Sequence, residues 1–179
     1  DQAWAWAADA HGFKCNGCSD NCCTSLFFHH TFVEKAYFLH GFQCLEPEKQ
    51  NRLILRAETY CNRMLVQQTR ARSLKLMCPA NEEGLCLLYP FRPMICRLHG
   101  LPHELSRPGG RTFHGPGCAA GNFDDTHSIS FDRTPFYQQM AQIELEYRRR
   151  FHLNEKIKQT IAQMISSAVS RSGDAAITH

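Results

Sequence analysis

Cysteines are the residues of this chain whose type and spacing indicate chemistry. The sequence has ten of them in 179 residues, and Cys15, Cys18, Cys22 and Cys23 lie within one short segment. Thiols so close in sequence rarely reach disulfide geometry, whereas zinc and iron accept several thiolate donors at short spacing. Side chains of adjacent residues tend to point apart, so Cys22 and Cys23 suit two neighbouring sites or one larger cluster. The segment is therefore predicted to bind metal.

A second cysteine group lies farther along the chain. Cys78, Cys86, Cys96 and Cys118 fall in residues 77–122, which hold six of the eight prolines, seven glycines and no sustained helical period. Such a segment is difficult to hold by hydrophobic burial alone. We therefore expect a bound metal to organise this lobe, and we expect the two cysteine groups to meet in space and share ions.

The ordered set of motifs resembles a known family. The motifs are Cys15-x2-Cys18-x3-Cys22-Cys23, Cys78-Pro79, Gly84-Leu85-Cys86-Leu87-Leu88-Tyr89 and Arg92-Pro93-x2-Cys96-Arg97. They are similar to those of the YkgJ-type cysteine-cluster proteins, described as zinc- or iron-chelating and named for a CxxCxxCC signature. This chain has three residues before its adjacent cysteine pair, where that signature has two. The resemblance covers residues 15–118.

The resemblance implies a set of ligands and a cofactor. The implied ligands are Cys15, Cys18, Cys22, Cys23, Cys78, Cys86 and Cys96, with Cys118 as the eighth. Flagellin lysine methylases, which look similar, carry an iron–sulfur cluster. Eight thiolates with an adjacent pair suit an iron–sulfur cluster, such as a 4Fe–4S centre, better than two zinc ribbons. Zinc stays open as the alternative, because both accept four thiolates.

Two arginines flank the proposed ligand Cys96. Arg92 and Arg97 would offset the negative charge of a four-thiolate site and donate hydrogen bonds to sulfur, so both are candidate residues of the cofactor site. The alternative is an ordinary ion pair with Glu82 or Glu83. We favour the role beside the metal.

Hydrophobic periodicity predicts the helices that must position these cysteines. Apolar residues at three- and four-residue steps indicate an amphipathic helix over residues 48–76. A C-terminal helical pair is predicted over residues 132–172, with Asn154 capping its second helix. Cys61 lies on the apolar stripe of the first of these helices. We expect Cys61 and Cys44 to be core thiols and not ligands, because cysteine is among the most buried residue types.

The predicted fold class is mainly α, with an irregular, cysteine-rich loop lobe organised by metal. Hydrophobic residues make up 43% of the chain and charged residues 21%, a composition typical of a folded globular protein. A length of 179 residues suits a single small domain over residues 1–179. Within this domain we expect a cysteine-cluster region at residues 15–122, into which the helix at residues 48–76 is inserted.

Composition and motifs argue against several classes of function. The formal net charge of +3 is too small for the basic face of a nucleic-acid-binding module, so no nucleic acid is expected as a partner. No apolar run reaches the length of about eighteen residues that spans a membrane, so we expect no membrane partner and a cytoplasmic location. The sequence has no GxSxG motif, Walker loop or dinucleotide fingerprint. It indicates no particular protein partner.

Three functions remain open, and the sequence does not decide whether the protein is an enzyme. The first is a metal- or iron–sulfur-cluster-binding protein with a redox, sensory or chelating role. The second is an iron–sulfur-dependent, methylase-like modifying enzyme, which would need a pocket beside the centre lined by Arg92, Arg97, His99 or His103. The third is a zinc-stabilised interaction module. The eight clustered cysteines favour the first.

Overall fold

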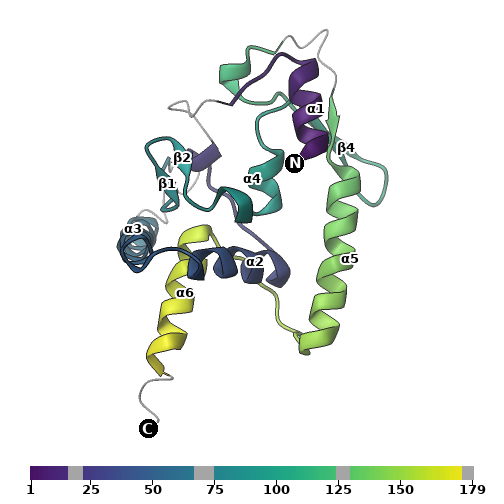
Figure 1. Cartoon of the computed structure of the whole chain (residues 1–179). Coiled ribbons are helices and arrows are strands. Elements are labelled where there is room, and N and C mark those ends of the chain that lie inside the picture. Colours follow the sequence, from purple (N-terminus) through teal and green to yellow (C-terminus); the bar gives the residue numbers. More distant parts are fainter. Residues whose placement is uncertain (16–21, 67–74, 124–129, 175–179) are drawn as a thin grey trace. The chain divides into compact units, whose positions relative to one another are not determined.

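The computed structural model describes residues 1–15, 22–66, 75–123 and 130–174. Within these residues the chain forms six α-helices and two small sheets (Figure 1), which confirms the mainly α prediction. The chain divides into two compact units, one of Asp1–Cys22 with Met94–Asn154 and one of Cys23–Pro93 with Glu155–His179. Their union in a single domain stays a prediction. In the described part, no helix combines the length and the apolar character needed to cross a membrane.

Three helices form the core of the second unit. They are α2 (Phe32–Gln43), α3 (Pro47–Val66) and α6 (Ile161–Asp174). α6 packs along α3 and also contacts α2 (Figure 1). Their fully buried side chains include Phe38, Leu53, Met164 and Ile165. Burial of each such side chain stabilises the fold by about 1.5–3 kcal/mol, so these helices hold together through apolar packing.

Two helix boundaries differ from the sequence prediction. The helix expected over residues 48–76 is confirmed as α3 up to Val66, residues 67–74 lie outside the described part, and Lys75 and Leu76 are not helical. The last helix begins at Ile161 and not after an Asn154 cap. The prediction therefore placed one helix end too late and one helix start too early.

Local hydrogen bonds explain the late start of α6. The His29 N–H donates to the Gln159 carbonyl at 2.8 Å and the Gln159 N–H donates to the His29 carbonyl at 3.0 Å, which keeps the preceding segment extended. The Gln163 N–H then donates to Thr160 Oγ1 at 3.3 Å, while the Thr160 N–H donates to Gln163 Oε1 at 2.9 Å. This reciprocal pair is a capping box, which fixes a helix N-terminus.

The first unit combines helices with a three-stranded sheet. Its helices are α1 (Gln2–Ala10), α4 (Met94–Leu98) and α5 (Thr134–Phe151), and its strands are β3 (His103–Ser106), β4 (Thr112–Gly115) and β5 (Phe131–Asp132). Strand β3 lies in the middle, antiparallel to β4 and parallel to β5. Ala7, Ala8 and Leu101 form a small buried cluster that aromatic side chains cover. Helix α5 confirms the first helix of the predicted C-terminal pair.

The segment at residues 77–122 is more regular than expected. It contains the hairpin of β1 (Asn81–Glu82) and β2 (Leu85–Cys86), the short helix α4 and the β3–β4 hairpin. The segment is also divided between the two units after Pro93. Buried apolar side chains anchor its parts, among them Ala80, Leu88, Leu98 and Leu101. Their irregular spacing follows neither a helical nor a strand period, so periodicity could not reveal them.

The buried His29 predicts a pH dependence of stability. Burial, and to a lesser degree the charge of His30, lowers the pKa of His29 from 6.5 to about 4. Between pH 6.5 and 4, His29 therefore binds a proton in the unfolded chain and stays neutral in the folded chain. We expect the free energy of unfolding to fall by up to about 1.4 kcal/mol per pH unit as pH decreases through this window. Denaturant unfolding of wild type and His29→Gln should show a shallower dependence in the variant.

The exposed His40 provides the matched control for this prediction, because His40→Gln removes a histidine that is not buried and whose ring has an edge contact with Phe91. That variant should keep the wild-type slope. Equal slopes in wild type and His29→Gln between pH 6.5 and 4 would contradict the prediction.

Gly41 of α2 predicts a packing constraint. A Cβ atom at this position would overlap the Phe91 ring. Replacing glycine by alanine in a helix normally stabilises by about 0.5–1 kcal/mol, whereas overpacking costs about 1–3 kcal/mol. We expect Gly41→Ala to lower the free energy of unfolding by about 1–2 kcal/mol, measured by denaturant titration. In a Phe91→Ala background the loss should be smaller, because the ring atoms are gone while the Cβ of residue 91 stays 2.6 Å from the new Cβ. A loss of equal size there would refute the steric explanation.

Candidate metal centre

The β1–β2 hairpin carries Cys86 and begins just after Cys78. Glu83 and Gly84 form its two-residue turn, with φ of 52° and 86°. Positive φ at both positions is the geometry that matches the twist of a tight hairpin, and glycine adopts it without strain. The Gly84 N–H also donates to Asn81 Oδ1 at 3.1 Å, which closes the turn. The hairpin therefore sets the position of Cys86 relative to Cys78.

Two arginines of α3 hold the hairpin on the helix. Arg56 Nη1 donates to the Asn81 carbonyl at 3.0 Å. Arg52 and Arg56 also lie 3.4 and 3.3 Å from the Glu82 carboxylate. These ion pairs are partly exposed, so each contributes at most about 1 kcal/mol, and their geometry matters more than their energy. Because Arg52 and Arg56 lie one helical turn apart, both side chains can pair with the Glu82 carboxylate.

The segment after Cys86 is anchored on α2. Leu88 is 1% exposed. The 3-10 helix η3 (Tyr89–Phe91) follows, and its Phe91 ring packs against Tyr37 with centroids 5.2 Å apart. The Tyr37 hydroxyl also donates to the Pro90 carbonyl at 3.0 Å. Cys86 therefore lies between two anchors, the arginines on one side and this aromatic contact on the other.

The first cysteine group reaches the second at Cys23. The Cys78 N–H donates to the Cys23 carbonyl at 2.7 Å, which joins two segments that are far apart in sequence. Burial raises the pKa of the Cys86 thiol, the neighbouring Cys23 raises it further, and a backbone hydrogen bond from Leu88 and the charge of Arg92 act in the opposite direction. Within the second unit, Cys23 thus lies against the segment that carries Cys78 and Cys86. The sharing of ions by the two groups stays a prediction.

Arg92 and Arg97, the two predicted partners of the centre, have different surroundings. Arg92 lies with its guanidinium 3.5 Å from the centroid of the Tyr89 ring, and its charge lowers the pKa of Cys86. Arg97 belongs to the first unit, where it lies 2.6 Å from the Asp1 carboxylate. The Glu82 carboxylate pairs with Arg52 and Arg56.

Cys44 and Cys61 differ from each other. Cys44 is exposed, so its expected place in the core is wrong. It follows α2 directly at the helix C-terminus, where the chain is near solvent. Cys61 is half-buried on α3, with its Sγ 3.8 Å from Ser166 Oγ of α6. Its neighbour Tyr60 is buried, and burial with the charges of Cys78 and Cys61 raises the pKa of Tyr60 to about 12.

The remaining predicted ligands belong to the first unit or lie outside the described residues. Cys15 is exposed, while Cys22, Cys96 and Cys118 are half-buried. Cys96 lies in α4, and the Cys118 N–H donates to the Gly100 carbonyl at 2.8 Å. Cys18 lies outside the described part. Their role as ligands stays a prediction.

The donor set fits a thiophilic metal in type, although its atoms are not in coordination geometry. Three half-buried thiols from Cys23, Cys78 and Cys86 are the soft ligands that zinc and iron–sulfur clusters take. Among the described residues, however, no three His, Cys, Asp or Glu side chains are arranged closely enough to hold an ion. Binding at these residues would therefore require the thiolates to close around the metal.

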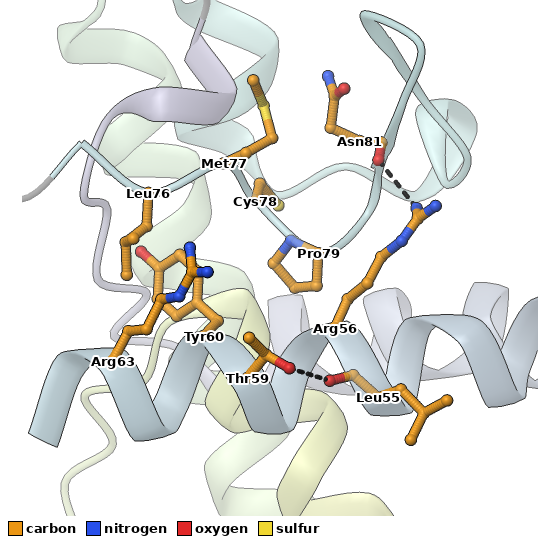
Figure 2. Close-up of a pocket in the computed structure, with 10 residues that line it drawn as sticks. All are labelled: Leu55, Arg56, Thr59, Tyr60, Arg63, Leu76, Met77, Cys78, Pro79 and Asn81. Carbon is orange, nitrogen blue, oxygen red and sulfur yellow. Dashed lines mark hydrogen bonds between the residues drawn. The ribbon is translucent and has the colours of Figure 1, made fainter.

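An open pocket of about 370 Å³ lies beside Cys78, between α3 and the segment at residues 76–81 (Figure 2). Its lining residues are Leu55, Arg56, Thr59, Tyr60, Arg63, Leu76, Met77, Cys78, Pro79 and Asn81. Neither Arg92, Arg97, His99 nor His103 is among them. The pocket that a modifying enzyme would need beside its centre therefore has a different lining here, with cationic groups from α3.

Sequence reasoning missed Arg56 and Asn81, which position the hairpin. The signals were present in the chain. Arg52 and Arg56 are four residues apart on the polar face of α3, and Asn81 precedes a glycine by three residues, as turn-forming asparagines do. Many surface arginines and asparagines share such spacing. The two signals therefore identify a contact only when the segment that each residue contacts is known.

Comparison with known protein families, with curated proteins and with solved structures found no match. The resemblance to the YkgJ-type proteins thus rests on the quoted motifs alone.

Cys61 and Cys44 are predicted not to bind metal. We expect Cys61→Ser to keep the full metal content while lowering the free energy of unfolding by about 1 kcal/mol, because the half-buried thiol packs between α3 and α6. Cys44→Ser should change stability by less than about 0.5 kcal/mol, since Cys44 is exposed. Elemental analysis and denaturant unfolding check both. Loss of one equivalent of metal from Cys61→Ser would show that Cys61 is a ligand and would contradict the prediction.

Proposed function

We propose that this chain is a metal- or iron–sulfur-cluster-binding protein, and that Cys23, Cys78 and Cys86 supply ligands to one centre in the second unit. A redox, sensory or chelating role follows from such a centre. The single observation that carries the proposal is the hydrogen bond from the Cys78 N–H to the Cys23 carbonyl, which joins Cys23 to the segment that carries Cys78 and Cys86.

The anchors around these cysteines support the proposal. A metal site needs ligands whose backbones hold their positions while the side chains adjust. The Cys78 and Cys86 backbones are held by the hairpin and by Arg56 of α3. Cys23 is held to Cys78 by its backbone carbonyl. Closing the site then requires rotation of thiol side chains more than movement of the chain.

The charge balance also supports the proposal. Three thiolates around a divalent ion leave a net charge of −1, which is costly in a half-buried site unless a cation lies near. The Arg92 guanidinium acts on the Cys86 thiol and supplies that positive charge. An arginine placed in this way favours thiolate over thiol, which is the form that binds metal.

The other proposed ligands are Cys15, Cys18, Cys22, Cys96 and Cys118, which complete the set of eight. Tetrahedral zinc and each iron of a cluster take four donors in all, so three protein thiolates require a further ligand. An iron–sulfur cluster is the favoured centre and zinc the alternative. Colour separates the two, since a cluster absorbs visible light and thiolate-bound zinc does not.

Substitution of the three converging cysteines tests this function. We expect the full chain, purified without oxygen, to contain stoichiometric iron and sulfide or stoichiometric zinc. Cys23→Ser, Cys78→Ser and Cys86→Ser should each weaken metal retention against a competing chelator by at least about tenfold, because a hydroxyl is a poor ligand for a soft metal. Elemental analysis and the absorption spectrum provide the measurement.

Cys44→Ser is the matched control, since it removes an exposed thiol from the same unit and should leave metal retention unchanged. The proposal fails if the wild-type chain binds neither metal nor cluster. It also fails if the three variants retain as much metal as the Cys44 control.

A further inference from the structure

Asn81 carries a buried hydrogen-bond donor that the described residues leave unsatisfied. The residue is 9% exposed, and its Nδ2 is buried with no hydrogen-bond partner in the described part of the chain. Its other polar groups are all used. The N–H donates to the Cys78 carbonyl at 3.0 Å, and the carbonyl accepts from Arg56. A buried donor without an acceptor costs about 1–3 kcal/mol, so this one calls for an explanation.

The orientation of the Asn81 amide is fixed by its neighbour. Nitrogen and oxygen of an asparagine amide can exchange places by a half-turn of the side chain. Here Oδ1 accepts from the Gly84 N–H at 3.1 Å, so the exchange would bring two donors face to face. Figure 2 shows the amide directed away from Arg56. The unsatisfied N–H groups therefore cannot be removed by flipping the amide.

The strand register places this donor beside Cys86. Asn81 and Cys86 are directly opposite each other in the β1–β2 pair. The Leu87 N–H donates to the Ala80 carbonyl at 2.9 Å, so the adjacent pair is the hydrogen-bonded one. Asn81 and Cys86 consequently form the closer, non-hydrogen-bonded pair, with Cα atoms about 4.5 Å apart and side chains on one face. Cys86 is thus the residue that the ladder places directly across from Asn81, with its side chain on the same face.

We infer that the Asn81 side-chain N–H donates a hydrogen bond to the metal-bound thiolate of Cys86, which makes Asn81 a positioning residue of the proposed centre. A neutral thiol is a weak acceptor, whereas a thiolate accepts well. The donor therefore gains its partner when the site is loaded. The inference rests on the proposed function, because it requires Cys86 to be a ligand.

Cobalt(II) is a suitable probe, because its thiolate complexes absorb through sulfur-to-metal charge transfer. The full chain, reduced and freed of metal, is titrated with Co²⁺ under anaerobic conditions. Asn81→Asp keeps an oxygen acceptor for Gly84 and removes the donor. Asn81→Ala removes the donor without adding a charge or a new donor, which separates loss of the donor from gain of a carboxylate. Asn51→Asp on the exposed start of α3 is the control for charge alone.

We expect Asn81→Asp and Asn81→Ala to weaken Co²⁺ binding by about tenfold and to move the charge-transfer band to longer wavelength. The shift follows because the hydrogen bond stabilises the sulfur lone pair, and losing it lowers the energy of the transition. Asn51→Asp should match wild type. A weaker affinity without a band shift would mean a structural role only, and would overturn the inference.

Other outcomes are equally decisive. An effect in Asn81→Asp with none in Asn81→Ala would assign the change to the new charge and overturn the hydrogen bond. Unchanged variants would mean that water or another group satisfies the donor. A wild-type chain that binds no Co²⁺ would remove the proposed function itself, whereas normal binding with unchanged variants would remove only the role of Asn81.

Discussion

The candidate site in the second unit depends on one backbone hydrogen bond, from the Cys78 N–H to the Cys23 carbonyl at 2.7 Å. It joins the N-terminal cysteine segment to the hairpin segment, and the approach of the candidate ligands follows from it. One such bond contributes only about 0.5–1.5 kcal/mol, so it cannot bring the two segments together unaided. The hydrogen bond from Arg56 to the hairpin and the packing of Phe91 on α2 further restrain the segment that carries Cys78 and Cys86. The candidate centre is thus positioned by helices that carry none of its proposed ligands.

Periodicity predicted the helices well where one face is buried and the other is solvated. Helix α3 shows this pattern, with Leu53 and Ala57 buried on one stripe. Periodicity did not identify α2. Its aromatic residues are spread around the helix and are only partly buried, so no single apolar stripe forms. Periodicity also misplaced the start of α6, because the His29–Gln159 bridge competes with helix in the preceding residues. The Thr160-x-x-Gln163 capping signature was available in the sequence and would have corrected that start.

Cysteine spacing pointed to the residues of the candidate site but not to its geometry. The structure joins Cys23 to Cys78 by a backbone hydrogen bond, and metal ligation by these residues stays a prediction. The division of residues 77–122 between two units could not be foreseen, since it depends on contacts between segments distant in sequence. The role of Arg56 could not be foreseen either. It depends on the hydrogen bond to the Asn81 carbonyl at 3.0 Å, and Asn81 is distant in sequence.

The packing of the second unit bears on what a metal would do there. In a zinc finger the free energy of metal binding is the free energy of folding, because no core exists without the ion. Here Phe38, Leu53 and Met164 are fully buried in helices that carry none of the proposed ligands, and Ala80 and Leu88 anchor the hairpin segment itself. The fold around the candidate ligands therefore has its own apolar support. A metal at the proposed centre would then bind and leave without unfolding the helices, and for this reason we propose a redox, sensory or chelating role in preference to that of a zinc-stabilised interaction module.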